Sequence, residues 1–472
     1  MESGKLNPTP VESELEESLY AVRQKIQPRA VHGWFANWRV ALVLFTQLLY
    51  YGLPWLKWDG HQAVLFDLAA RKFYIFGLTL WPQDFIWLTG LLIISALSLF
   101  LFTTVAGRLW CGYACPQTVY TEIFMWIEEL AEGSHLARRK LDTSPWTFEK
   151  LRKRGLKHLL WFLVAFWTGL TFVGYFTPIT LLSSELLNFS TGPWETFWIF
   201  FYAFATWGNA GFMREQVCKY MCPYARFQSV MFDPDTLVIS YDPSMGEPRG
   251  PRSKKADYKA LGLGTCVDCN ICVQVCPTGI DIRKGLQYEC IGCAACIDGC
   301  NQVMEKMGYP KGLIRYTTES VLKGKYADSS ILSHIFRPRV LVYSAILLTI
   351  IGIFLFTLAN RVPLRVEAIR DRATLSRTND EGRLENLYTL QILNMENRPH
   401  RYKLSASGID NIHVDVDEKL LDVGPQDTAQ IPIRLEVEPE NLKGPSTTVM
   451  IRVQSEENPE LVREVKSSFL RR

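Results

Sequence analysis

Residues 266–300 of the chain read CVDCNICVQVCPTGIDIRKGLQYECIGCAACIDGC, and this stretch holds eight of the twelve cysteines. The spacing C-x2-C-x2-C-x3-C runs from Cys266 to Cys276 and recurs from Cys290 to Cys300. Every cysteine of the first copy therefore returns 24 residues later, as 290 minus 266 shows. A constant shift of this kind marks an internal repeat, and it predicts a small duplicated domain built around its cysteines.

This cysteine run is the bacterial [4Fe-4S] signature, in which the fourth cysteine of each run ligates the other cluster. Zinc also accepts four thiolates per site, but it does not need this duplicated order. The second copy departs from the pattern at Asn301, where a proline comparable to Pro277 is usual. We therefore assign Cys266, Cys269, Cys272 and Cys300 to one cluster and Cys290, Cys293, Cys296 and Cys276 to the other.

The rest of the chain is rich in apolar segments, because 48% of the residues are hydrophobic and 12% are aromatic. These values exclude a disordered chain. Five segments contain no Asp, Glu, Lys or Arg and approach the ~20 residues that cross a bilayer. Buried helices of a soluble protein would carry a polar stripe, which these segments lack. We therefore predict an α-helical bundle with spans at residues 40–56, 85–105, 159–177, 196–213 and 340–360.

Lysine and arginine set the orientation of such a bundle, since short cytoplasmic loops carry an excess of them. Residues 106–158 hold nine, whereas residues 178–195 hold none. With five spans, the N-terminus and the region between the fourth and fifth helices face the cytoplasm, and residues after 360 lie outside. All twelve cysteines then lie in a reducing compartment, which favours metal or redox chemistry over disulfides.

Four cysteines lie outside the ferredoxin-like repeat, in two motifs offset by 107 residues. We call residues 111–116 (CGYACP) and 218–223 (CKYMCP) the first and second edge motif, because each follows an inward-running span. Proline disfavours helix at the residue before it and suits the first position of a new helix. Cys115 and Cys222 are thus expected at helix N-caps, where the helix dipole would lower the thiol pKa.

Thiolates at these positions would bind a soft metal such as Cu(I), zinc or an iron-sulfur centre. The alternative is four buried, unreactive cysteines, which are common in apolar surroundings. The same motif occurs twice at the same topological position, and this favours a function. The candidate catalytic and copper-binding residues are Cys111, Cys115, Cys218 and Cys222.

The C-terminal region has a different pattern from the bundle. Apolar and polar residues alternate with period two, and Asn, Gly, Asp and Pro separate the segments. This pattern predicts a β-sandwich with strands at residues 387–393, 412–416, 428–437 and 447–453. One further short strand is expected at residues 236–240, before the ferredoxin-like repeat.

Several features together resemble the cytochrome oxidase accessory protein family known as CcoG, FixG or RdxA. They are residues 110–119 (WCGYACPQTV), the second edge motif, residues 286–298 (LQYECIGCAACID) and the Ig-like tail. The resemblance covers nearly the whole chain beyond its N-terminal tail. It implies a bacterial inner-membrane oxidoreductase that reduces Cu(II) to Cu(I) for assembly of a cbb3-type cytochrome oxidase. It also implies two [4Fe-4S] clusters and copper-linked or electron-linked thiols in the edge motifs.

The expected fold is a multi-domain membrane protein with a five-span α-helical bundle, a cytoplasmic α+β ferredoxin-like domain and an all-β Ig-like sandwich. The expected parts are a disordered tail (residues 1–37), four spans with the edge motifs (38–232), the connector and ferredoxin-like domain (233–338), the fifth span (339–360) and the periplasmic sandwich (361–472).

Two other functions remain open at this stage. A quinol-oxidising electron-transfer subunit would share the paired motifs, but no span carries a charged residue to accept the protons. A non-catalytic copper-holding assembly factor would use the sandwich to dock a periplasmic copper chaperone or an oxidase assembly factor.

Expected partners follow from charge and compartment. A net charge of +3 does not favour nucleic acid. A basic run before the repeat could dock an acidic electron donor such as a flavodoxin, or it could be a solvated positive-inside loop. Whether two copies form a homodimer is left open by the sequence. The basic run consists of Arg249, Arg252, Lys254, Lys255 and Lys259.

Overall fold

In the computed structural model, residues 26–328, 335–371, 376–379, 381–442 and 444–471 are described. The chain forms two compact units, Met1–Ile351 and Gly352–Arg472. The ferredoxin-like repeat and the membrane region belong to the same unit, and the domain boundary expected at residue 232 stays a prediction. The division between the units falls inside the last long helix, before the boundary expected at residue 360.

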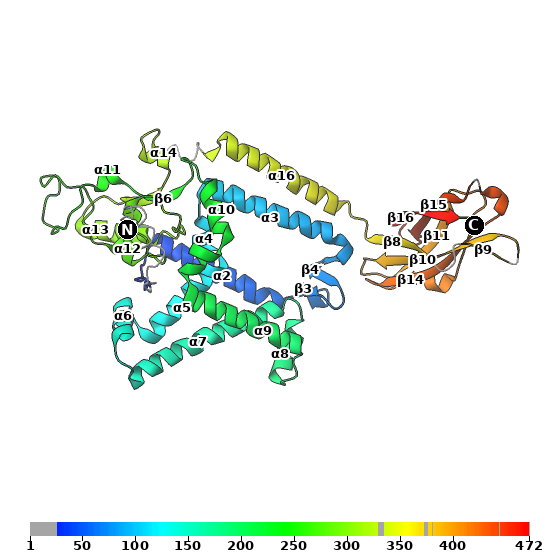
Figure 1. Ribbon diagram of the computed structural model, residues 1–472, viewed down its shortest axis with the longest axis horizontal. Helices are drawn as coiled ribbons and strands as arrows, with labels where there is room; N and C mark the ends of the chain where they lie inside the picture. Colours follow the sequence, from blue (N-terminus) through cyan, green and yellow to red (C-terminus); the bar gives the residue numbers. More distant parts are fainter. Residues whose placement is uncertain (1–25, 329–334, 372–375, 380, 443, 472) are drawn as a thin grey trace, which may run out of the picture. The chain divides into compact units, whose positions relative to one another are not determined.

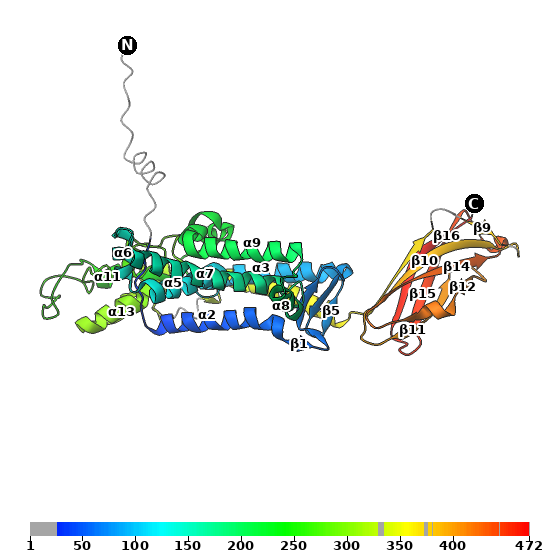
Figure 2. The ribbon, with the colours of Figure 1, turned by 90° about the horizontal axis from the view of Figure 1, so that it is seen from below.

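The first unit contains long helices that run alongside one another (Figures 1 and 2). Helix α3 coincides with the span expected at 85–105. Helix α7 begins well before residue 159, and the search for apolar segments missed its first turns because they are basic and polar. The fourth span is a short α-helix followed by a π-helical segment. The helices are α2 (Trp34–Gly52), α3 (Phe85–Ala106), α7 (Phe148–Val173), α9 (Pro193–Thr206) with η3 (Trp207–Met213), and α16 (Pro338–Ala359).

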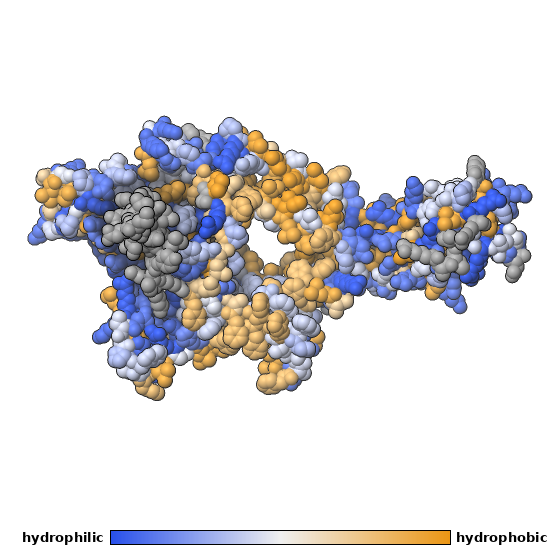
Figure 3. Space-filling model, viewed as in Figure 1, coloured by the Kyte–Doolittle hydropathy of each residue, from blue (hydrophilic) through white to orange (hydrophobic). Residues whose placement is uncertain are grey.

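Three helices are long and apolar enough to cross a membrane, and they cover Pro82–Ala106, Phe148–Val173 and Pro338–Ala359 in the described part of the chain. Helix α3 leaves large apolar side chains such as Ile86 and Leu92 exposed, as a lipid-facing helix does. Figure 3 shows hydrophobic residues gathered over α3 and α16. Helix α2 and the α9–η3 segment do not meet this standard, so the five-span topology stays a prediction.

A small β-region that the sequence analysis missed joins α2 to α3. It contains a two-stranded sheet and a three-stranded antiparallel sheet in the order β3-β4-β5. It lies at the end of the helices opposite the ferredoxin-like repeat (Figures 1 and 2). Its strands are β1 (Lys57–Trp58), β2 (His61–Gln62), β3 (Val64–Asp67), β4 (Lys72–Ile75) and β5 (Leu78–Leu80).

The ferredoxin-like domain is small and mixed. The strand expected at residues 236–240 is β6 (Val238–Tyr241), and it pairs antiparallel with β7 (Ile314–Thr317). Between these strands lie α12 (Ile271–Gln274) and α13 (Ala295–Met307), which carry cysteines of the two repeats. The shorter helices α11 (Pro243–Gly246) and α14 (Glu319–Leu322) flank the sheet.

Asp298 on α13 joins the ferredoxin-like domain to helix α2. The N-cap residue of α2 is Gly33, which has no side chain to satisfy the first backbone N–H groups. The Asp298 carboxylate accepts these bonds instead, from the N–H of Ala36 at 2.8 Å and of Phe35 at 3.5 Å. A carboxylate at a helix N-terminus also interacts favourably with the helix dipole. The first turn of α2 is therefore capped by a residue from the cluster-binding repeat.

The expectation of a disordered tail over residues 1–37 is wrong for residues 26–37. Helix α2 begins at Trp34, and the segment before it packs against the first unit. The N–H of Arg29 donates to the carbonyl of Gln274 at 2.8 Å, and the guanidinium of Arg138 donates to the carbonyl of Pro28 at 3.2 Å. Residues 1–25 lie outside the described residues.

The second unit is a sandwich of two antiparallel sheets. One sheet has the order β12-β14-β10-β8, with β9 paired to β10, and the other has the order β13-β11-β15-β16. The side chains of Leu390, Ile433, Val453 and Phe469 are fully buried in its core. All four expected strands are present, and five further strands were not expected. They are β8 (Leu364–Arg370), β9 (Arg377–Thr378), β10 (Leu384–Asn394), β11 (His400–Ser407), β12 (His413–Val416), β13 (Asp422–Val423), β14 (Thr428–Val437), β15 (Ser446–Ser455) and β16 (Val462–Leu470).

Removal of the cap from α2 tests the joint between the domains. We expect Asp298→Ala to lower the free energy of opening of the first turn of α2 by about 0.5–2 kcal/mol, because two N–H groups lose their acceptor. Hydrogen exchange at the amides of Phe35 and Ala36 measures this change. Asp298→Asn keeps an acceptor oxygen and should exchange more slowly than Asp298→Ala. Equal exchange in Asp298→Ala and the parent protein would contradict the proposed cap.

Candidate cluster and thiol site

The two cysteine loops of the repeat have matching backbone conformations. Asp268 and Asn270 have positive φ angles of 52° and 55°, and the equivalent Gly292 and Ala294 have φ angles of 68° and 59°. This left-handed conformation costs a residue with a side chain roughly 1–2 kcal/mol. Its occurrence at the same two positions of both copies indicates that the loop wraps its cysteines around a common point.

The cysteines of the repeat gather around two cavities. The first cluster cavity is lined by Cys266, Cys269, Cys272 and Cys300. The second cluster cavity is lined by Cys276, Cys290, Cys293 and Cys296, and also by Cys272, which the two cavities share. The structure thus brings together the same two groups of four that the repeat predicts, including the exchange of Cys276 and Cys300. Ligation itself stays a prediction.

The chemistry of the cavities fits iron-sulfur clusters. Ile239, Ile280 and Ile282 line the second cavity between its thiols, and all the cysteines are free thiols. Burial raises the pKa of Cys272 to about 11 and the pKa of Cys290 and Cys300 to about 12. Buried thiols of this kind become ligands when a bound metal replaces their protons.

The edge motifs have the local structure that their prolines predict. Helix α4 (Leu109–Tyr113) ends before Cys115, which has extended backbone angles and caps α5 (Pro116–Glu132). In the second motif, η4 (Val217–Met221) is a π-helical turn, and Cys222 caps α10 (Pro223–Met231). The π-helical turns η3 and η4 were not expected from the sequence. Such turns are rare and often occur at functional sites.

The prediction that the helix dipole lowers the pKa of Cys115 is wrong. Burial raises the pKa of this thiol, although the backbone N–H groups of Gln117 and Thr118 act in the opposite direction. The pKa of Cys111 is raised to about 12, mainly by burial and then by Cys115. Burial also raises the pKa of Cys218 to about 11. Desolvation of the thiolate therefore outweighs the favourable dipole of the cap.

The four edge cysteines are neighbours in space. Cys111 interacts electrostatically with Cys115 and Cys218, and Cys115 interacts with Cys222. The thiol of Cys111 also donates a hydrogen bond of 3.4 Å to Oε1 of the buried Gln228. Nevertheless, among the residues that the structure describes, no three His, Cys, Asp or Glu side chains are arranged to hold one metal ion. The same finding covers the cysteines of the repeat, so it does not distinguish the edge thiols from the cluster cysteines.

Hydrogen bonds brace the two motifs against each other. The side-chain amide of Gln117 donates to the carbonyls of Asn209 at 3.0 Å and Arg214 at 3.1 Å, just before the second motif. In return, the guanidinium of Arg108, just before the first motif, donates to the carbonyl of Ala225, just after the second. These contacts hold the two edge motifs together, because residues that flank the first motif bind backbone carbonyls that flank the second.

The first edge motif touches the loop of the second cluster cavity. A Cβ atom on Gly112 would lie 2.8 Å from both Cys293 Cα and Gly292 O, closer than real Cβ contacts. A Cβ atom on Gly292 would lie 3.0 Å from Arg108 O. The hydroxyl of Tyr316 donates to Gly292 O at 2.7 Å and completes this contact. The backbones of residues 111–115 and of a cysteine loop are therefore in direct contact.

A buried ionic network supports the second edge motif. Glu128 is 1% exposed, and its carboxylate lies 2.9 Å from Arg138 and 2.5 Å from Arg214. Lys157 lies 2.8 Å from Glu132. Burial acts to raise the pKa of Glu128, but Arg214, Lys157 and Arg138 together lower it. Some of the cations that predict the orientation of the membrane region thus also form a structural network, which sequence spacing alone could not reveal.

The basic run before the repeat has two different roles. Arg252 is structural, because its guanidinium donates to the carbonyls of Gly264 at 2.7 Å and Cys266 at 3.2 Å and lies over the ring of Tyr309. The side chains of Lys254 and Lys255 are exposed. Arg249 and Lys259 are also exposed. The exposed members of the run remain available to a partner, whereas Arg252 fastens the loop before Cys266.

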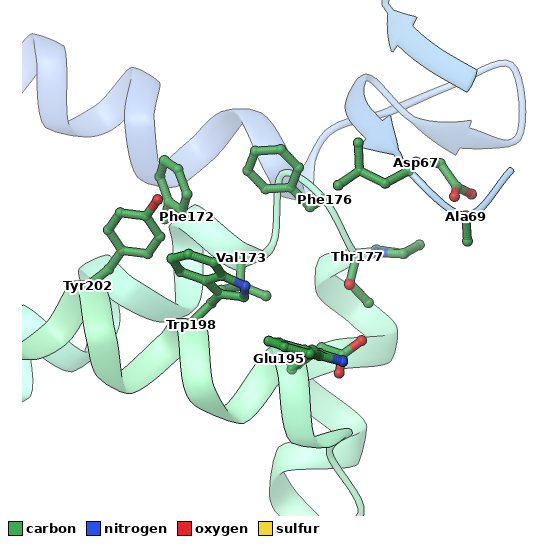
Figure 4. Close-up of a pocket in the computed structure, with 12 residues that line it drawn as sticks. Asp67, Ala69, Phe172, Val173, Phe176, Thr177, Glu195, Trp198 and Tyr202 are labelled. Carbon is green, nitrogen blue, oxygen red and sulfur yellow. The ribbon is translucent and has the colours of Figure 1, made fainter. Parts of the chain in front are cut away.

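A separate cavity of about 600 Å³ lies away from all the cysteines, between β3 and the ends of α7 and α9. Figure 4 shows the rings of Phe172, Trp198 and Tyr202 on its wall and the carboxylates of Asp67 and Glu195 at its margin. The sequence analysis missed this cavity. Its acidic side chains, Asp67 and Glu195, lie outside the five apolar segments. A test for charged residues within those segments therefore does not find them.

Serine variants of single cysteines test the ligand assignment. We expect Cys300→Ser and Cys266→Ser to remove the same cluster, and Cys276→Ser and Cys290→Ser to remove the other, because each pair lines one cavity. Each variant should lose about half of the iron, since one of two clusters fails to assemble. Iron analysis and electron paramagnetic resonance of the reduced protein measure this. Loss of the same resonance signal in Cys300→Ser and Cys290→Ser would contradict the assignment.

Gly112→Ala tests the contact between the first edge motif and the cluster loop. The added methyl group meets backbone that cannot rotate away, so we expect destabilisation of about 1–3 kcal/mol, seen as a lower unfolding temperature of the first unit. Gly155→Ala in α7 is a matched control, because its Cβ atom would meet nothing within 4 Å. Equal unfolding temperatures for the two variants would show that the contact is looser than described.

Family profiles match the iron-sulfur region and the C-terminal unit of the chain. Family profiles described as a 4Fe-4S dicluster domain and a 4Fe-4S binding domain match residues 213–319 and 87–143. A profile described as the IG-like fold at the C-terminal of FixG matches residues 354–472. A solved structure, a FixG-related protein from Vibrio parahaemolyticus, is 26% identical, covers 23% of this chain and 97% of its own, and has a TM-score of 0.21.

Full-length relatives extend the match over most of the chain. The nitrogen fixation protein FixG of Rhizobium meliloti is 40% identical over 83% of this chain and 80% of its own length. The protein RdxA of Cereibacter sphaeroides is 40% identical over 84% of each chain. The chain therefore belongs to the FixG/RdxA family, as an iron-sulfur electron-transfer protein with two [4Fe-4S] clusters.

Proposed function

We propose that the protein is a cupric reductase of the bacterial inner membrane, which reduces Cu(II) to Cu(I) for assembly of a cbb3-type cytochrome oxidase. The observation that carries this proposal is the contact of Gly112 with Cys293, which puts the edge thiols beside the second cluster cavity. Soft thiols next to a one-electron carrier suit copper, because thiolates favour Cu(I) over harder ions.

The reaction is a transfer of one electron, in which Cu(II) gains the electron and becomes Cu(I). When bound, the two clusters supply electrons one at a time. Cys111, Cys115, Cys218 and Cys222 bind the copper substrate, and their sulfur atoms hold Cu(I) more tightly than Cu(II). Each tenfold preference for Cu(I) raises the copper potential by 59 mV and makes its reduction more favourable.

A cavity shared by an edge thiol and a cluster cysteine supports electron transfer to copper at the edge motifs. Met125, Glu215 and Cys218 line a narrow cleft that also reaches Cys293, so one edge thiol faces the same space as a cysteine of the second cluster cavity. A copper-holding assembly factor would not need this shared space between an edge thiol and a cluster cysteine.

The orientation of the protein belongs to this proposal. The nine Lys and Arg residues of residues 106–158 favour a cytoplasmic location for the clusters and the N-terminus. With five spans, the sandwich then lies in the periplasm, where it would dock an oxidase assembly factor or a copper chaperone. The exposed Lys254, Lys255 and Lys259 suit an acidic electron donor such as a flavodoxin.

Quinol oxidation is a second candidate, because the cavity in Figure 4 has aromatic walls and two carboxylates that could accept protons. The cavity lies near the N-terminal end of α3, whereas the edge thiols lie after the C-terminal end of α3. The 22 residues of α3 span about 33 Å at 1.5 Å per residue. Electron tunnelling over this distance without an intermediate carrier is too slow to support turnover, so cupric reduction is the preferred function.

Thiol substitution in the first edge motif tests the cupric reductase. We expect Cys111→Ser and Cys115→Ser to slow Cu(II) reduction by about 10–100-fold, because the copper ligands are lost while all eight cluster ligands remain. The rate is measured anaerobically with pre-reduced protein and a Cu(I)-specific dye. Ala114→Ser adds a hydroxyl within the same motif without removing a thiol, and it should leave the rate unchanged.

Three results would count against the proposal. Equal rates of Cu(II) reduction in the parent protein and the cysteine variants would show that the edge motifs do not bind the copper that is reduced. Copper bound stoichiometrically without oxidation of the clusters would favour the copper-holding function. Reduction of the clusters by quinol in liposomes would favour the second candidate.

A further inference from the structure

Arg108 is a buried cation at the junction of the two edge motifs. It is 5% exposed and lies between α3 and α4, three residues before Cys111. Its guanidinium donates one hydrogen bond, to the carbonyl of Ala225, and its Nε atom has no hydrogen-bond partner. Within the described ranges it forms no ion pair with Asp or Glu.

The other buried arginines have acidic partners. Arg39 lies 3.4 Å from Glu122, and Arg138 and Arg214 share Glu128. A buried charge without a partner costs several kcal/mol, so an arginine in this position needs another source of negative charge.

The thiols near Arg108 become its negative partners when a bound cluster or metal replaces their protons. Three thiols interact electrostatically with its guanidinium: Cys111 and Cys218 of the edge motifs and Cys290 of the second cluster cavity. Burial raises the pKa of each thiol, and Arg108 acts to lower it. The backbone contact of Arg108 with Gly292 holds the arginine against the same cysteine loop.

We propose that Arg108 is a positioning residue whose fixed positive charge is the counter-ion of the second cluster and of the edge thiols. Four thiolate ligands make the cluster site anionic, and reduction adds one further negative charge. A buried cation nearby stabilises the reduced state more than the oxidised state, because Coulomb interactions are strong in a low-dielectric interior. Arg108 therefore raises the potential of the second cluster and favours arrival of an electron beside Cys111 and Cys218.

The first cluster cavity has a different electrostatic environment. Its neighbouring cation is Arg283, which is paired with Asp281 at 2.7 Å and with Asp268 at 2.5 Å. These two carboxylates offset the charge of Arg283, whereas no carboxylate offsets Arg108. The two cavities thus differ in the charge that each cluster meets, although their cysteine loops are repeats of one another.

The experiment is a redox titration of the full-length, cluster-loaded protein in lipid nanodiscs without copper, followed by electron paramagnetic resonance. Arg108→Gln removes the charge, and we expect at least a tenfold shift of the second cluster's reduction equilibrium toward the oxidised state, which is 59 mV for one electron. Arg108→Lys keeps the charge and should stay near the parent potential. Arg283→Gln is the matched control, since it should shift the first cluster and leave the second unchanged.

Each outcome decides the proposal. An unchanged potential of the second cluster in Arg108→Gln would overturn it. If Arg108→Gln and Arg108→Met lose the second cluster while Arg108→Lys retains it, the requirement for positive charge supports the proposal. If Arg108→Lys also loses it, the bond to Ala225 is the essential feature, and the counter-ion role is overturned. The delivery of electrons to Cys111 and Cys218 rests on the proposed function. The effect of Arg108 on the potential of the second cluster does not rest on the proposed function. A failure of copper reduction would therefore leave the shift of that potential intact.

Discussion

The contact between two backbones at Gly112 and Cys293 is the constraint on which the functional arrangement depends. No side chain larger than hydrogen fits at residue 112, so the middle of the first edge motif lies directly on a cluster-binding loop. Asp298 makes a second connection between the repeat and the membrane region by capping helix α2. Both interactions use atoms of the cysteine repeat itself, and the repeat and the membrane region therefore form one compact unit.

Short-range features of the chain were predictable because their causes are local. Proline after Cys115 and Cys222 sets the helix starts, and period-two alternation locates strands β10, β12, β14 and β15. The unexpected features depend on distant residues. Asp298 caps a helix 262 residues away from it in the chain, and Gln117 braces a π-helical turn whose own sequence resembles that of an apolar span. No local pattern contains this information.

Burial changes the electrostatic role of two residues from the role that their motifs predict. A helix N-cap favours a thiolate, but Cys115 is buried deeply enough for desolvation to dominate its pKa. Similarly, Arg138 contributes to the positive-inside pattern and yet serves as a buried partner of Glu128. In both cases the residue type indicates the kind of interaction, and the burial of the site determines its strength and sign.

The central claim is that a cluster lies close enough to the edge thiols to reduce copper bound there. Rapid-freeze electron paramagnetic resonance after mixing reduced protein with one equivalent of Cu(II) tests this claim most directly. The Cu(II) signal and an equal number of reduced-cluster spins should disappear together at one rate, which leaves one of the two clusters reduced. A Cu(II) signal that persists beside an unchanged cluster signal would contradict it.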